Sequence, residues 1–76
     1  MKLIISATPT TPAHLTVVNG NEIIVEYEVY GQNLEEAIDT VFQERYIEAV
    51  QFIEHGSYIE RFASYIANKY QGVEIL

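Results

Sequence analysis

Two glutamates on one predicted strand are the residues whose spacing first suggests chemistry. Glu26 and Glu28 stand two positions apart in the segment 22–30, and alternate residues of a strand point to the same side of a sheet. Two carboxylates on one side can work as a general acid and a general base when their environments separate their pKa values. Alternating glutamates more often form the solvated side of a half-buried strand, so we interpret this pair as surface.

The two histidines do not complete a catalytic set. His14 follows a proline-containing segment, and His55 lies next to Gly56, where a predicted helix ends. A histidine near a helix C-terminus is explained by its favourable interaction with the helix dipole. The chain has no cysteine, and neither its histidines nor its carboxylates have the close spacing of a metal site. We therefore predict no enzymatic activity, no metal and no other cofactor.

The net charge determines the kind of partner to expect. The chain of 76 residues has eleven acidic and four basic residues, a formal net charge of −7. Direct binding to nucleic acid or to an anionic membrane needs clustered basic residues, and four scattered cations do not provide them. An acidic surface favours a protein partner with a basic surface instead. The simpler interpretation is that the charge only keeps the domain in solution.

The length of the chain predicts a single domain over residues 1–76, because two cores would each be too small to fold. Association is the remaining source of added stability for so short a chain, which has neither a disulfide nor a predicted metal site. Its apolar runs are shorter than the ~20 residues that span a bilayer. The start at Met1 lacks a signal-peptide pattern, so we expect a cytoplasmic setting.

Three strands are predicted, over residues 2–7, 15–18 and 22–30. The segment Asn19-Gly20-Asn21 between the last two indicates a hairpin. A three-residue loop over 19–21 places Val17 opposite Ile23 and gives the hairpin one apolar side, whereas a two-residue loop of Asn19 and Gly20 does not. The side chains expected toward the core are Ile23, Val25, Tyr27 and Val29, and those expected outside are Ile24, Glu26, Glu28 and Tyr30.

Two helices are predicted after the strands, one from Leu34 to about His55 and one from Tyr58 to about Tyr70. Asn33 with Glu36, and Ser57 with Glu60, have the spacing of capping boxes. The expected fold is α+β: a small antiparallel sheet of about three strands packed against an antiparallel pair of helices. The expected element order is β-β-β-α-α, and residues 73–76 could add a short closing strand.

Arg45 lies in the middle of the apolar stripe of the first predicted helix. A buried guanidinium is costly unless a carboxylate pairs with it. One interpretation is that its side chain extends past Phe42 to solvent, or pairs inside the fold with Glu48 or Glu74. The other is that Arg45 marks an interface where a partner supplies the acid.

The first predicted function is that of a non-enzymatic module that binds a basic, nucleic-acid-binding surface of a partner protein. Carboxylates spaced along a strand and a helix can imitate a row of phosphates. In size and charge the chain resembles small acidic phage proteins that inhibit host defence, anti-CRISPR proteins among them, and this analogy implies an inhibitor that acts by occupancy. The residues expected to bind the partner are Glu26, Glu28, Tyr30, Glu35, Glu36, Asp39 and Glu44.

The second predicted function is that of a self-associating structural or regulatory homo-oligomer without catalytic activity. The second half of the first predicted helix is apolar over most of its circumference and would form a symmetric dimer interface. The residues expected in that interface are Tyr46, Ile47, Val50 and Ile53. The two functions are compatible, because an inhibitor can itself be a dimer.

Overall fold

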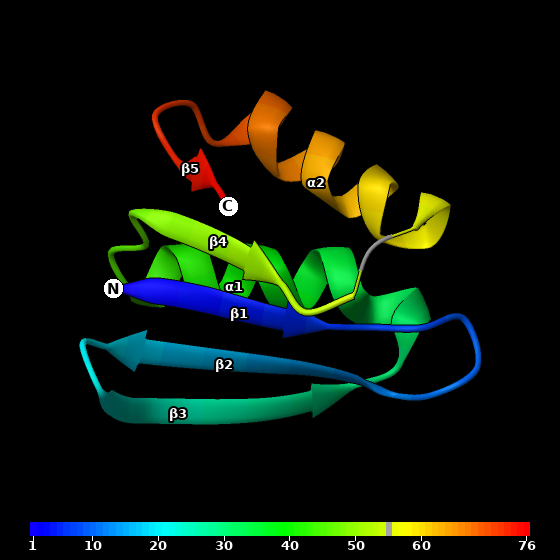
Figure 1. Cartoon of the computed structure of the whole chain (residues 1–76), viewed down its shortest axis with the longest axis horizontal. Coiled ribbons are helices and arrows are strands. Elements are labelled where there is room, and N and C mark those ends of the chain that lie inside the picture. Colours follow the sequence, from blue (N-terminus) through cyan, green and yellow to red (C-terminus); the bar gives the residue numbers. More distant parts are fainter. Residues whose placement is uncertain (55) are drawn as a thin grey trace.

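A mixed sheet with both helices on one of its faces forms the structure. The computed structural model describes residues 1–54 and 56–76. The strands are β1 (Lys2–Ser6), β2 (Ala13–Asn19), β3 (Glu22–Val29), β4 (Ala49–Phe52) and β5 (Glu74–Ile75). A single 3-10 turn, η1 (Gly31–Asn33), leads into helix α1 (Leu34–Glu44), and helix α2 (Ser57–Lys69) follows β4. The five strands lie in the order β3-β2-β1-β4-β5 (Figure 1).

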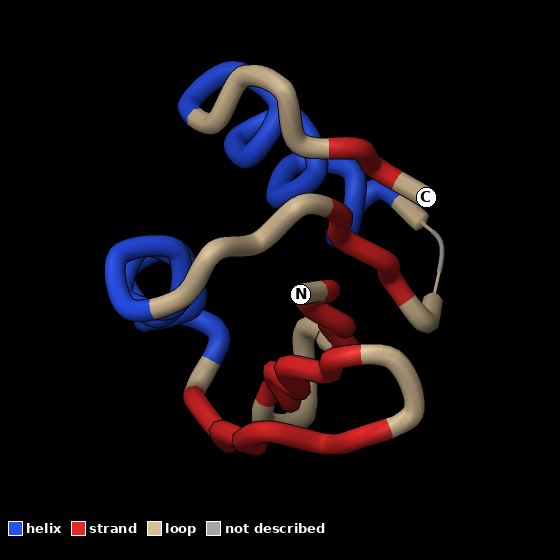
Figure 2. The backbone as a smooth tube through the Cα atoms, turned by 90° about the vertical axis from the view of Figure 1, so that its left-hand side faces the viewer, coloured by secondary structure: helices blue, strands red, loops and turns tan. Residues whose placement is uncertain are grey.

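The strand directions explain why the two helices share one face. β1 lies at the centre of the sheet and pairs antiparallel with β2 and parallel with β4. β3 is antiparallel to β2 and so runs parallel to β1 and β4, and β5 is parallel to β4. The chain therefore makes two crossovers between parallel strands, from β3 to β4 through α1 and from β4 to β5 through α2. Both crossovers step toward β5, and such connections are nearly always right-handed. Both helices therefore lie on the same side of the strands (Figure 2).

The core lies between the sheet and the two helices. Alternate residues of the central strands point into it, as Leu3 and Ile5 of β1 show, and neither of these side chains is exposed at all. The helices contribute residues at helical spacing, among them Ile38 from α1 and Phe62 from α2. Within residues 1–54 and 56–76, no polar or charged residue is fully buried. Apolar burial is therefore the main source of stability.

The predicted α+β class is confirmed, but the predicted sheet and element order are wrong in detail. The sheet has five strands with mixed pairing, and the order is β-β-β-α-β-α-β. The first three strands lie where the alternation of residues predicts them. The helices are not an antiparallel pair, because both cross over from one strand to the next parallel strand and so run in the same direction (Figure 1).

The predicted long helix is wrong beyond Glu44. α1 ends there, and Arg45 has extended backbone angles, φ −139° and ψ 149°. Residues Ala49–Phe52 form β4, whose burial alternates with Val50 and Phe52 pointing inward. A short apolar run fits a buried strand as well as a buried helix. The backbone groups on the second side of β1 need partners, and β4 supplies them.

The predicted hairpin register is wrong, because the loop has two residues and β3 contains a bulge. Asn19 pairs with Glu22, so the loop has two residues, Gly20 and Asn21, and Gly20 takes a positive φ of 63°. Val18 pairs with Ile23 but Val17 pairs with Val25, which leaves Ile24 as the extra residue. Ile23 therefore points outward, 59% exposed, and Ile24 packs against the core. The inward direction predicted for Val25, Tyr27 and Val29 is confirmed.

Neither predicted capping box forms. Asn33 makes no side-chain hydrogen bond to α1, and α2 begins one residue early, with Gly56 at its N-cap position. Backbone carbonyls accept the hydrogen bonds of the N–H groups at these helix starts instead. The N–H of Asn33 donates to the oxygen of Tyr30, and the N–H groups of Ile59 and Glu60 donate to the oxygen of Gly56. The prediction for His55 lies outside the described residues.

The β4 assignment predicts different effects at two neighbouring apolar residues. Val50→Ala is expected to lower the free energy of unfolding by about 2–3 kcal/mol, because Val50 is fully buried and its truncation leaves a cavity. Ile53→Ala is the matched control, since Ile53 is 54% exposed, and should cost less than about 0.5 kcal/mol. Urea denaturation measures both. Equal losses at the two positions would contradict β4 and favour a two-sided apolar helix.

Candidate functional site

Acidic side chains gather along β3 and α1. β3 carries Glu22, Glu26 and Glu28, and α1 carries Glu35, Glu36 and Glu44, and all six side chains are exposed. Neither element contains a lysine or an arginine. Because no cation on these two elements offsets the carboxylates, the exposed surfaces of β3 and α1 are acidic and attract a basic partner.

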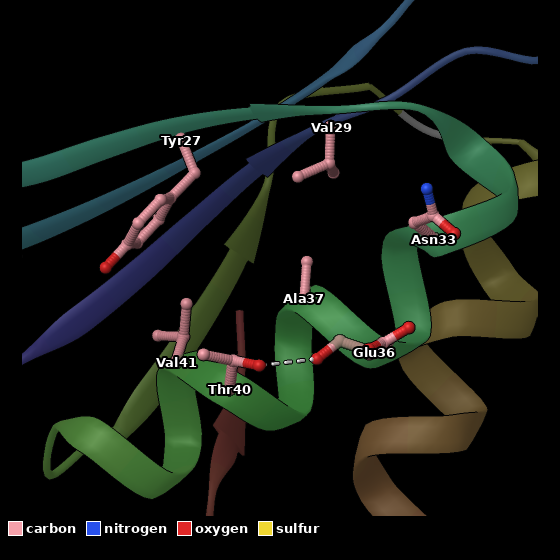
Figure 3. A pocket seen from close by; sticks show the side chains of 7 residues that line it. All are labelled: Tyr27, Val29, Asn33, Glu36, Ala37, Thr40 and Val41. Carbon is pink, nitrogen blue, oxygen red and sulfur yellow. Dashed lines mark hydrogen bonds between the residues drawn. The ribbon is translucent and has the colours of Figure 1, made fainter.

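A groove of about 370 Å³ lies between β3 and α1. Figure 3 shows Tyr27 and Val29 pointing from β3 toward Ala37 and Val41 of α1 across the hollow. The polar rim consists of Asn33, Glu36 and Thr40. The groove exists because α1 crosses from β3 to β4 and packs over the centre of the sheet, which leaves the inner side of β3 only half-buried.

Carboxylates border the groove and also line the opposite side of β3. Glu36 lines the groove, and Glu44 accepts a hydrogen bond of 3.4 Å from the hydroxyl of Tyr27. Glu26 and Glu28 point away from the helices, toward the open face of the sheet, where Glu28 lies 3.9 Å from Nε2 of His14. β3 is therefore flanked by negative charge on both sides.

The predicted partner-binding residues divide into six that are exposed and one that is not. The exposed ones are Glu26, Glu28, Tyr30, Glu35, Glu36 and Glu44. Tyr30, 68% exposed, stands apart from the groove and lines a second hollow with the proline loop and Arg61. Of the residues that line the groove only Glu36 was predicted as a site residue; the others are Tyr27, Val29, Asn33, Ala37, Thr40 and Val41. Their only sequence signal is a position beside the acidic residues.

Asp39 belongs to a hydrogen-bonded cluster between the two helices. Its carboxylate accepts hydrogen bonds from the hydroxyl of Tyr65 at 2.7 Å, from Nζ of Lys69 at 2.9 Å and from the hydroxyl of Tyr70. Its side chain is 22% exposed. The ring of Tyr70 also stacks on Phe42 of α1, with centroids 4.0 Å apart. Asp39 therefore joins α1 to the end of α2 and contributes little to the exposed acidic surface.

The cluster fixes the charge of each of its members. Partial burial is the largest single influence on Asp39 and raises its pKa, but the hydrogen bonds from Tyr70, Tyr65 and Lys69 together outweigh it, so the pKa lies below its ordinary 3.8. The hydrogen bond to Asp39 raises the pKa of Tyr65 and of Lys69. Burial, followed by the same carboxylate, raises the pKa of Tyr70 to about 12. Near neutral pH the cluster thus holds one carboxylate, one ammonium and two neutral phenols.

Arg45 follows the last residue of α1 and is half-buried. None of the ion pairs between described residues includes it, and its Nε is buried without a hydrogen-bond partner. The predicted pairing with Glu48 or Glu74 is therefore not seen. Glu48 lies 3.9 Å from the N-terminal ammonium instead.

The residues predicted for self-association do not form one surface. Ile47 and Val50 are 5% and 0% exposed, so both belong to the core. Tyr46 and Ile53 are 76% and 54% exposed and flank β4 at its two ends. Val50 points inward as part of β4, and the other three residues lie just outside that strand, so the predicted two-sided helix does not form.

Comparisons with protein-family models, curated proteins and solved structures give no match to this chain. In the described part of the chain, no helix combines the length and the apolar character needed to cross a membrane. Among residues 1–54 and 56–76, no three histidine, aspartate or glutamate side chains are grouped so that they could hold a metal ion. The site is thus defined by its own geometry: an acidic strand, an acidic helix and the groove between them.

The lowered pKa of Asp39 predicts a pH-dependent loss of stability. The stabilisation from its carboxylate is fully present above the ordinary pKa of 3.8 and is lost as the pH falls through the lower pKa of the folded state. Asp39→Asn should reduce the free energy of unfolding by about 1–2 kcal/mol at neutral pH. It should also reduce the loss of this free energy as the pH falls into the acidic range.

Urea denaturation at a series of pH values measures this effect. Glu35→Gln is the matched control, because Glu35 is an exposed carboxylate of the same helix outside the cluster, and it should leave the acid dependence unchanged. The role of the cluster would be contradicted if Asp39→Asn and Glu35→Gln had the same pH profile.

Proposed function

We propose that this protein is a non-enzymatic protein-binding module whose acidic surface occupies a basic, nucleic-acid-binding surface of a partner protein. The observation that carries the proposal is the set of six exposed carboxylates on β3 and α1, two elements without a lysine or an arginine. Electrostatic attraction of this kind speeds association and selects a partner of opposite charge. The proposed setting is the cytoplasm, where nucleic-acid-binding proteins are accessible.

The proposed mode of action is occupancy. Carboxylates at alternate positions of a strand, such as Glu26 and Glu28, stand about 7 Å apart, and those of α1 extend the negative surface along a helix. A basic groove that binds a phosphate backbone can bind such a surface instead. The analogy in size and charge with small acidic phage inhibitors of host defence, including anti-CRISPR proteins, favours an inhibitor within this class.

Self-association is the alternative function, on a surface that keeps Ile53 from the predicted set and adds the C-terminal residues. Exposed apolar side chains occur on and beside β4 and β5, where Ile53 is 54% and Leu76 52% exposed. β5 is an edge strand of two residues, so a second copy could pack beside it. A dimer formed there would leave the acidic surface on β3 and α1 free for a partner.

A competition experiment tests the occupancy proposal. Proteins captured from a lysate of the source organism or its host, at low and at high salt, are identified by mass spectrometry. Each captured nucleic-acid-binding protein is then purified, and its binding to labelled nucleic acid is measured by fluorescence anisotropy with this protein added. We expect displacement of the nucleic acid that weakens as the salt concentration rises.

Charge reversal on α1 is the decisive variant. Glu35→Lys combined with Glu36→Lys should weaken the competition by about tenfold or more, since like charges then face the basic surface. Glu60→Lys combined with Glu74→Lys is the matched control, because it changes the net charge equally at exposed residues outside β3 and α1. The proposal would be contradicted if the two double variants had equal effects, or if displacement of the nucleic acid did not depend on the salt concentration.

A further inference from the structure

We propose that the free edge of β3, together with the groove beside it, binds an extended basic segment of a partner protein, which adds to the sheet as a further strand. This inference rests on the proposed function and specifies both the surface used and the form of the partner. Three features of the described residues support it: an unpaired strand edge, an apolar groove and carboxylates on both sides of the edge.

The edge of β3 is long and unpaired. β3 has eight residues and pairs only with β2 in the described part of the chain, whereas β5 at the opposite edge has two residues. At alternate residues of an edge strand the N–H and C=O groups point away from the sheet and are free to pair with another strand. β3 contains no proline that would prevent such pairing.

The groove lies where alternate side chains of an added strand would point. A strand beside β3 directs every second side chain toward the helix side, and there the half-buried Val29 and Ala37 offer apolar contacts. Glu36 at the rim and Glu44 beside Tyr27 add negative charge on this side, which attracts a segment of positive net charge. Recognition by main-chain pairing plus alternate side-chain pockets is an established mode of peptide binding.

The remaining side chains of the added strand would point toward the open face of the sheet. They would meet Glu26 and Glu28, both exposed, and opposite charges on neighbouring strands stabilise a sheet. The same carboxylates disfavour a second copy of this chain, because pairing two β3 edges would bring like charges together. We therefore infer a segment in which lysine or arginine alternates with apolar residues.

The probe for this inference is a synthetic ten-residue peptide of alternating lysine and valine. Its binding to the intact 15N-labelled protein is measured at low salt by NMR titration, with a matched peptide that is N-methylated at alternate residues. The N-methylated peptide keeps the charge but cannot complete strand hydrogen bonds. We expect shift changes concentrated in β3 and the groove, and binding of the N-methylated peptide weaker by about tenfold or more.

Filling the groove supplies a second readout. Thr40 is exposed at the rim, so Thr40→Trp should block the groove without disturbing the core and weaken binding of the lysine–valine peptide about tenfold. Ser64→Trp is the matched control, because Ser64 is an exposed residue of α2 that does not line the groove. It should leave the affinity unchanged.

The outcomes separate this inference from the proposed function. If both peptides bind equally and the shifts spread over all acidic residues, strand addition is wrong while the acidic docking surface stands. If neither peptide binds even at low salt, strand addition is overturned, and the acidic docking surface is then decided by the competition experiment with the charge-reversal variants. If analytical ultracentrifugation shows a dimer and hydrogen exchange shows that the outward amides of β3 are protected, a second copy occupies the edge, and the inference of a basic segment is overturned.

Discussion

The parallel pairing of β1 with β4 is the constraint on which the rest of the structure depends. β1 already pairs antiparallel with β2, so a partner for its other side has to come from a later part of the chain. A parallel partner requires a crossover, and the crossover from β3 carries α1 over the sheet to β4. Because α1 covers the centre of the sheet, the inner side of β3 stays half-buried. The groove is therefore a consequence of the topology.

Local patterns predict the elements that depend on neighbours in the sequence. The alternation in the first thirty residues predicts β1, β2 and β3, and helical spacing with a turn before it predicts α2. Local patterns do not predict β4, because its four residues continue the apolar stripe of α1 and fit a longer helix as well. Arg45 looked like a charge inside a helical core for the same reason, whereas it lies in the extended segment after α1.

The sequence predicts the acidic residues of the candidate site but predicts neither the groove nor the cluster around Asp39. Glutamates on the outer side of a strand and in the first turn of a helix are solvated for local reasons, and they are exposed. Asp39 differs because its partners Tyr65, Lys69 and Tyr70 stand 26 to 31 residues away in the sequence. The groove likewise requires β3 and α1 to meet at a particular angle, which no residue spacing encodes.

Amide hydrogen exchange of the free protein tests the open edge of β3 most directly. Along residues 25–29, amides that point toward β2 should exchange slowly, and those that point away should exchange nearly as fast as in loops. Such alternation would show that a paired side and an accessible side coexist in one strand. Uniformly slow exchange along β3 would mean that the edge is already covered, and the account of β3 as an open docking edge would be contradicted.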